Sequence, residues 1–134
     1  MLSQDDRNQL IRAAIATRAL AYAPYSNYAV GAALLTRSGH VYTGVNIENA
    51  AYPSSMCAER VAIYKAISEG EKEFEVIVVA TENGGTPCGA CRQVMAEFGL
   101  DTIVLVVDAQ ENIREETTVA GLLPFSFGPQ DLKA

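Results

Sequence analysis

The sequence has few of the residues on which several common protein classes depend. It contains three cysteines, one histidine and no tryptophan in 134 residues. An odd number of cysteines cannot pair off fully as disulfides, so a disulfide-stabilised secreted fold is not expected. The one histidine, His40, follows Ser38 and Gly39 in an expected turn and lies far from the cysteines in the sequence. We therefore assign His40 no catalytic role.

The sequence also lacks long apolar runs and blocks of positive charge. No apolar run is long enough to span a bilayer, and the first residues, MLSQDDR, lack the basic region and hydrophobic core of a signal peptide. We expect a cytoplasmic protein without a membrane partner. The 16 acidic residues outnumber the 10 basic ones and give a formal net charge of -6, which would repel a phosphate backbone. Nucleic acid is therefore not an expected partner.

The residues that are present fit one compact domain. A chain of 134 residues that is 49% apolar can enclose one hydrophobic core, and no repeat, low-complexity tract or linker divides it. We therefore predict a single domain over residues 1–134.

Apolar periodicity alternates between helix and strand along the chain. Residues 4–21 have helical spacing, with Ser3 as a candidate cap and Pro24 beyond the end. The β-rich runs 28–36 and 40–47 flank a turn and predict an antiparallel hairpin. The other predicted elements are helices over residues 57–69 and 88–98 and strands over 76–80, 102–107 and 113–119. This order predicts an α/β fold, a three-layer α/β/α sandwich with a mixed sheet of about five strands.

The three cysteines lie in two short motifs. The first, MCAER, spans residues 56–60 and places Glu59 two residues after Cys57; the second, PCGACRQ, spans residues 87–93 and contains Cys88 and Cys91. Three thiolates fill three corners of a zinc tetrahedron and leave the fourth for water, which is the open geometry of catalytic zinc. Each motif is weak alone, because Cys-x-x-Cys also occurs in redox helices and structural zinc sites. Together, with the proline and the glutamate in place, the motifs indicate a zinc deaminase of the three-cysteine type.

The spacing of Cys57 and Glu59 makes a geometric prediction. Residues two apart do not face each other on a regular helix, so the two side chains converge only if Cys57 lies at or just before the first turn. Cys88 and Cys91 are three residues apart and would share one face at the start of a second helix. Helix N-termini carry partial positive charge, which lowers thiolate pKa values and favours a bound metal.

Three thiolates on a divalent cation leave an excess of negative charge, which makes deprotonation of bound water harder. Arg60, next to Glu59, is our candidate for offsetting this charge by donating hydrogen bonds to thiolate sulfur. Arg92 is the second choice. The alternative interpretation of either arginine is a solvated position on a helix face.

Two segments outside the zinc motifs resemble a known family. These segments, AYAPYSNYAVGAA at residues 21–33 and GVNIENA at residues 44–50, are similar to the small homotetrameric cytidine deaminases, and the resemblance extends along nearly the whole chain. The resemblance implies a homotetramer in which Cys57, Cys88 and Cys91 bind one Zn2+ per subunit. It also implies that Glu59 shuttles protons.

The same resemblance implies a set of contacts to a nucleoside. Asn46 and Glu48 would hydrogen-bond the ribose 3′-hydroxyl. The Ala58 backbone N–H would meet the base carbonyl, and Tyr28 would flank the pyrimidine. Without the family, Asn46 would be interpreted as a turn cap and Glu48 as a surface charge. Many relatives have Phe at the position of Tyr28, so its hydroxyl departs from the commoner pattern.

Tyr52 and Phe127 have two interpretations. By default they are core aromatics. The resemblance instead implies active sites at subunit boundaries, where such rings close over a ligand bound to the neighbouring subunit.

The activity that the resemblance implies is hydrolytic deamination of cytidine and 2′-deoxycytidine to uridine and 2′-deoxyuridine, with release of ammonia, in pyrimidine salvage. In this hypothesis zinc lowers the pKa of its water, Glu59 takes that proton, and hydroxide attacks C4 of cytosine. Glu59 passes the proton to N3 and acts again as an acid when the amino group leaves as ammonia. One alternative is a sibling deaminase of another cytosine-containing nucleoside, such as a nucleoside antibiotic. A second is a structural zinc module in which Glu59 is the fourth ligand. Thiol redox chemistry is a third, but it leaves Cys57 and Glu59 unexplained.

Overall fold

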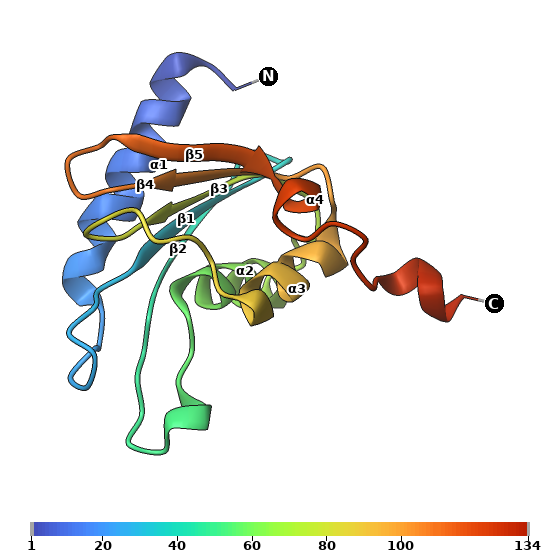
Figure 1. Cartoon of the computed structure of the whole chain (residues 1–134). Helices are drawn as coiled ribbons and strands as arrows, with labels where there is room; N and C mark the ends of the chain where they lie inside the picture. Colours follow the sequence, from blue (N-terminus) through green and yellow to red (C-terminus); the bar gives the residue numbers. More distant parts are fainter. Residues whose placement is uncertain (1, 134) are drawn as a thin grey trace.

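A five-stranded mixed sheet lies at the centre of the computed structural model, which describes residues 2–133 (Figure 1). The strand order is β2-β1-β3-β4-β5. The strands are β1 (Gly31–Thr36), β2 (Val41–Val45), β3 (Phe74–Ala80), β4 (Ile103–Val107) and β5 (Ile113–Thr118). β3 and β4 pair in parallel, and the other neighbouring pairs are antiparallel. The predicted mixed sheet is confirmed.

Helices cover both faces of this sheet (Figure 1). They are α1 (Gln4–Thr17), α2 (Ala58–Ser68), α3 (Gly89–Phe98) and the short α4 (Val119–Leu122). The buried side chains of α1 pack with Val76 and Val78 of β3, whereas those of α2 and α3 pack with Ile77 and Val79 of the same strand. Successive residues of a strand point to opposite faces, so the apolar run of β3 fills both layers. The predicted three-layer α/β/α sandwich is confirmed.

The first helix begins as predicted and ends earlier than predicted. Ser3 Oγ accepts a hydrogen bond from the Asp6 N–H at 3.0 Å, as expected of an N-cap. The sequence predicts helix to residue 21, whereas α1 gives way to one 3₁₀ turn at Arg18–Leu20. The Tyr22 N–H then donates to the Asn46 carbonyl at 3.0 Å. The chain leaves the helix because this long-range bond holds it beside the end of β2.

The predicted hairpin is present, and its first strand is shorter than predicted. Gly39 in the turn has a φ of 95°, the left-handed conformation that a tight turn favours. The sequence predicts that the strand begins at residue 28, whereas β1 begins at Gly31. The Asn46 side chain holds the preceding residues instead: its Oδ1 accepts from the Val30 N–H at 2.9 Å and its Nδ2 donates to the Tyr28 carbonyl at 2.8 Å. Asn46 therefore fixes the segment that carries Tyr28.

The remaining predicted elements are also present. The helices predicted over residues 57–69 and 88–98 correspond to α2 and α3, and the strand predicted over residues 113–119 is the edge strand β5. Short 3₁₀ turns occur at Tyr52–Ser54 and Pro129–Leu132. None of the helices within residues 2–133 has the length and apolar character needed to cross a membrane.

Candidate active site

The three cysteine sulfurs converge where two helices begin. Cys57 is the N-cap of α2, Cys88 is the N-cap of α3, and Cys91 lies in the first turn of α3. The Cys57 and Cys88 sulfurs are 3.8 Å apart, those of Cys88 and Cys91 are 3.5 Å apart, and all three lie within 4.8 Å of one another. Zinc–sulfur bonds of about 2.3 Å in a tetrahedron require separations of this size. The prediction that Cys57 lies just before the first helical turn is confirmed.

The segment before Cys57 is fixed by contacts with β2 and the residues that follow it. Ile47 and Met56 form an isolated antiparallel bridge, with N–H to carbonyl distances of 2.9 Å and 2.8 Å. Gly44 lies against the first turn of α2, where an added Cβ would lie 2.6 Å from the Ala62 nitrogen and still closer to the Ala58 carbonyl oxygen. The absence of a side chain at Gly44 therefore lets α2 begin where it does.

Glu59 is a buried carboxylate beside the cysteines. It is 4% exposed and lines the same pocket as Cys57 and Cys88. Burial raises the pKa of Glu59 to about 7, because surroundings of low polarity disfavour the charged form. A carboxyl group with a pKa near neutrality can both accept and donate a proton, which suits general acid–base chemistry.

Arg60 contacts the sulfur cluster as predicted. Its Nη2 donates to Cys57 Sγ at 3.4 Å. A hydrogen bond from the Cys91 thiol, together with the donor from Arg60, lowers the pKa of Cys57 to about 5. The Nε atom of Arg60 is buried with no hydrogen-bond partner among the described residues. The guanidinium of Arg60 is thus partly removed from water and lies within hydrogen-bond distance of a sulfur, a position suited to offsetting negative charge there.

Arg92, our second candidate for a sulfur contact, instead hydrogen-bonds to the loop that precedes Cys88. Its three donors go to oxygen atoms: Nε to the Pro87 carbonyl at 2.8 Å, Nη1 to the Leu122 carbonyl at 2.9 Å and Nη2 to Thr86 Oγ1 at 3.1 Å. Arg92, the second choice, therefore makes no hydrogen bond to sulfur within the described residues, and a solvated position on a helix face does not describe it either. The Arg92 side chain instead donates to two residues of the loop before Cys88 and to the last residue of α4.

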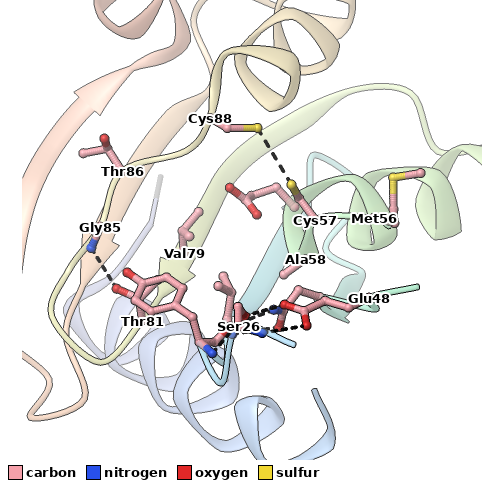
Figure 2. Close-up of a pocket in the computed structure, with 14 residues that line it drawn as sticks. Ser26, Glu48, Met56, Cys57, Ala58, Val79, Thr81, Gly85, Thr86 and Cys88 are labelled. Carbon is pink, nitrogen blue, oxygen red and sulfur yellow. Dashed lines mark hydrogen bonds between the residues drawn. The ribbon is translucent and has the colours of Figure 1, made fainter. Parts of the chain in front are cut away.

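A pocket of about 310 Å³ opens beside the cysteines. Figure 2 shows Cys57 and Cys88 at one end of it and Ser26 and Glu48 at the other. The pocket brings together most of the site residues that the sequence predicts, which are Tyr28, Asn46, Glu48, Cys57, Ala58, Glu59 and Cys88. Elements far apart in the sequence therefore supply one continuous cavity, with a charged group at each end.

Asn46 and Glu48 hold the chain segment that faces them. Glu48 Oε1 accepts from the Tyr25 and Ser26 N–H groups at 2.9 Å and 3.1 Å, and its Oε2 accepts from the Ser26 hydroxyl. The hydrogen bond from Ser26 is the main reason that the pKa of Glu48 lies below its ordinary value. Together with the Asn46 contacts to Tyr28 and Val30, these bonds form a clamp on residues 25–30.

Tyr52 and Phe127 lie outside this pocket. Tyr52 is 69% exposed and packs edge-on against Tyr25, with ring centroids 5.8 Å apart, and Phe127 is 57% exposed. The default interpretation that they are core aromatics is therefore wrong. Tyr52 begins one short 3₁₀ turn and Phe127 lies just before another, and no core element within residues 2–133 covers either ring.

Sequence reasoning missed one wall of the pocket. Thr81, Gly85 and Thr86, which follow β3, form this wall (Figure 2). The Gly85 N–H donates to Thr81 Oγ1 at 2.8 Å, which fixes the course of the loop. Polar residues directly after a buried strand with a parallel neighbour were the available signal, because ligands often bind at the carboxyl ends of such strands. Ser26, in the segment clamped by Glu48, was missed as well.

Comparison with known proteins agrees with this geometry. The sequence profile described as the cytidine and deoxycytidylate deaminase zinc-binding region matches residues 4–107. The chain belongs to this family.

Individual family members match nearly the whole chain. The cytidine deaminase of Sporosarcina psychrophila is 46% identical over 129 residues, which cover 95% of this chain and 95% of that protein. The cytidine deaminase of Halalkalibacterium halodurans is 49% identical over 130 residues, covering 95% of this chain and 98% of that protein. The crystal structure of the cytidine deaminase of Burkholderia pseudomallei has a TM-score of 0.85 at 47% identity, covering 90% of this chain and 98% of that chain. The chain is thus a zinc-dependent hydrolytic deaminase with the α/β fold of this family, and its three cysteines fit one zinc ion.

Proposed function

We propose that the protein hydrolyses cytidine and 2′-deoxycytidine to uridine and 2′-deoxyuridine with release of ammonia. The observation that carries this proposal is the pocket that has a three-cysteine group and a buried carboxylate at one end and Glu48 at the other. The relatives named as cytidine deaminases support the choice of substrate.

Glu59 carries the protons in this proposal. A zinc ion held by Cys57, Cys88 and Cys91 would supply a Lewis acid that lowers the pKa of water. Glu59 accepts one proton of the attacking water and delivers it to N3 of the base. It then takes the proton of the hydroxyl group now on C4 and passes it to the amino group, which leaves as ammonia while C4 becomes the carbonyl carbon of uridine. Burial excludes bulk water from the carboxyl group and holds its pKa near 7, so one residue serves in both directions.

The first turn of α2 would orient the base. Cys57 provides no side-chain cap to the helix, so the N–H groups of the first turn have no capping partner from that side chain. Ala58 carries one of these N–H groups, and the residue lines the pocket next to Glu59. Donation from Ala58 to the carbonyl oxygen of cytosine would place the N3 edge of the ring toward Glu59.

Asn46 and Glu48 would bind the ribose at the other end of the pocket. Glu48 is charged at neutral pH because its pKa is low, and a ribose hydroxyl can donate to it as the Ser26 hydroxyl does. The same negative charge would repel a phosphate group. Nucleosides should therefore be better substrates than nucleotides or the free base.

The alternative of a structural zinc module receives less support. Among the described residues, the side chains placed to hold one metal ion are the three cysteines, and Glu59 is not in that group. A three-ligand set leaves the fourth position for water, as catalytic zinc requires. Glu59 is then available as an acid–base group rather than as a ligand.

The proposal extends to the assembly and the setting of the enzyme. We propose a single catalytic domain that acts as a homotetramer in the cytoplasm and serves pyrimidine salvage. The support is the resemblance to small homotetrameric cytidine deaminases and the exposed rings of Tyr52 and Phe127, which in such an assembly would contact a ligand of a neighbouring subunit.

Ultraviolet absorbance of the zinc-loaded protein with cytidine, cytosine and CMP tests the proposed reaction. We expect cytidine to be converted to uridine, with much slower conversion of cytosine and CMP. The Glu59→Gln variant should lose turnover by more than the roughly hundred- to ten-thousand-fold typical of one acid–base group, because Glu59 acts twice. Glu73→Gln, which changes an exposed glutamate, is the matched control. Cytidine turnover by Glu59→Gln near that of the unmodified protein would rule out the role of Glu59.

A further inference from the structure

The Tyr28 hydroxyl joins two segments across the pocket. It donates to Asn83 Oδ1 at 2.8 Å. Tyr28 belongs to the segment clamped by Asn46 and Glu48, whereas Asn83 belongs to the loop between β3 and Cys88. A phenylalanine ring at position 28 could occupy the same place but could not make this bond, because it has no donor.

The Tyr28 hydroxyl also lies close to the backbone of Gly85, in the pocket wall formed by Thr81, Gly85 and Thr86. A Cβ added at Gly85 would lie 2.5 Å from Tyr28 Oη, so the hydroxyl can lie this close to the backbone because Gly85 has no side chain. The Gly85 N–H is held from its other side by Thr81 Oγ1. The loop is therefore fixed internally by Thr81 and across the pocket by Tyr28.

The position of Tyr28 is itself set by its backbone. Its N–H donates to Ser26 Oγ at 3.0 Å and its carbonyl accepts from Asn46 Nδ2 at 2.8 Å. With the main chain held on both sides, the ring has little freedom, and the hydroxyl is directed to Asn83 and Gly85. The hydrogen bond to Asn83 is thus the end of a continuous set of contacts that begins at Glu48.

The wall near Tyr28 faces a particular edge of the base if the proposed function is correct. Contacts from Ala58 and Glu59 occupy the edge that carries the carbonyl oxygen and N3. The opposite edge of a pyrimidine carries C5 and C6. Figure 2 shows Gly85 and Thr86 across the pocket from Ala58, so the C5 edge faces these two residues.

We propose that Tyr28 is a specificity-determining residue whose hydroxyl, through Asn83, holds the Gly85–Thr86 wall against the C5 edge of the pyrimidine. The wall admits cytidine and excludes cytosine nucleosides with a large group at C5. This assignment rests on the proposed deamination and adds to it a limit on the base.

Kinetics of Tyr28→Phe and Asn83→Ala with cytidine, 5-methylcytidine and 5-iodocytidine test the assignment. We expect the ratio of kcat/KM for 5-iodocytidine to kcat/KM for cytidine to rise about tenfold in each variant, because the loss of one hydrogen bond has an effect of about this size. The change should come mainly from a lower KM for 5-iodocytidine. 5-Methylcytidine should respond less, because a methyl group is smaller. The double variant should match the single variants, because both changes remove the same interaction.

Amide hydrogen exchange gives a readout that does not depend on activity. The Gly85 amide should exchange faster in Tyr28→Phe and Asn83→Ala than in the unmodified protein. Tyr42→Phe is the matched control: the Tyr42 hydroxyl donates to Glu69 at 3.3 Å, at the far end of α2, and its loss should change neither the exchange nor the substrate ratio.

Two kinds of result would overturn the assignment: one rejects the role of Tyr28 alone, and the other rejects the proposed function as well. Normal cytidine turnover with an unchanged substrate ratio in both single variants, or additive changes in the double variant, would reject the role of Tyr28 and leave the proposed function intact. Failure of the unmodified protein to deaminate any of the three nucleosides would reject the proposed function, and the assignment with it.

Discussion

Two glutamates that line the same pocket differ in charge because their surroundings differ. Burial raises the pKa of Glu59 to about 7, whereas the hydrogen bond from Ser26 holds the pKa of Glu48 below its usual range. At neutral pH Glu59 can therefore give and take a proton, while Glu48 stays charged and accepts hydrogen bonds. This difference supports the proposal that proton transfer takes place at the Glu59 end of the pocket and ribose binding at the Glu48 end.

Replacing Arg60 should weaken the hold of the site on zinc. Arg60→Gln removes the positive charge next to Cys57 Sγ, so the excess negative charge of three thiolates is no longer balanced. We expect zinc affinity, measured by competition with a chelator at constant pH, to fall by about 10- to 100-fold. Arg37→Gln, which removes an exposed ion pair with Asp101, is the control and should retain zinc normally. Equal zinc affinity in the two variants would contradict the role of Arg60.

At the scale of residues, sequence reasoning succeeded where a local rule fixes side-chain direction. Cys57 and Glu59 converge because the first turn of a helix places them so. For Arg92 neither interpretation from the sequence holds, because its partners include the Leu122 carbonyl and no local pattern reveals that contact. The same limit applies to Tyr28, whose hydroxyl reaches Asn83 only in the folded chain.

The site exists because two helices begin next to each other. α2 and α3 begin at Cys57 and Cys88, and their N-termini direct partial positive charge to the point where the sulfurs meet. Each start is held separately, the first by the bridge between Ile47 and Met56 and the second by Arg92. A shift of either helix would therefore separate the sulfurs without changing any ligand.

A methyl group at Gly44 should test this dependence on α2. Gly44→Ala would place a Cβ 2.6 Å from the Ala62 nitrogen, so the strand and the helix must move apart. We expect the free energy of unfolding to fall by about 1–3 kcal/mol, as in other overpacked cores, and zinc affinity to fall with it. Thermal unfolding measures the first effect and chelator competition the second.

Gly89→Ala is the control for the Gly44 variant. A Cβ at Gly89, in the first turn of α3, would meet no atom within 4 Å. This variant should unfold at the temperature of the unmodified protein. A Gly44→Ala protein that matches it in stability and in zinc affinity would show that β2 does not position α2.

At the scale of elements, periodicity predicted the helices and strands, and long-range contacts set several of their ends. The buried strand β3 was predicted from its continuous apolar run, because a strand that is buried on both faces has apolar residues at successive positions instead of alternating apolar and polar ones. β1 begins later than predicted because the Asn46 side chain replaces a strand partner for Val30. The end of α1 was also displaced, because Tyr22 bonds to Asn46. Contacts between distant residues cannot be inferred from periodicity.

Several exposed aromatic rings lie on the loop before α2 and on the C-terminal segment of the molecule. Tyr52, Phe125 and Phe127 are all more than half exposed, and Phe125 is fully so. Exposed large apolar groups of this kind agree with the proposed assembly, in which another chain would cover them. Residue type and spacing alone could not predict this exposure, because an aromatic residue has the same pattern in a core as in an interface; for Tyr52 and Phe127 the family resemblance was what favoured a subunit boundary.

Light scattering should detect the assembly that these rings indicate. We expect the purified protein to have the mass of four chains, and Phe125→Asp to shift the mass toward smaller species, because a buried charge without a partner is costly. Ile113→Asp, which changes an exposed apolar residue on the edge strand β5, is the control and should keep the mass of four chains. A single-chain mass for the unmodified protein would contradict the proposed homotetramer.

The most direct test of the whole account is the origin of the oxygen atom in the product. Cytidine is incubated with the zinc-loaded protein in water enriched in the heavy oxygen isotope, and uridine and ammonia are quantified by mass spectrometry and a coupled assay. The account predicts one labelled oxygen in each uridine, one ammonia per uridine, and no product with Glu59→Gln. Absence of uridine, or uridine without the label, would contradict hydrolytic deamination at this site.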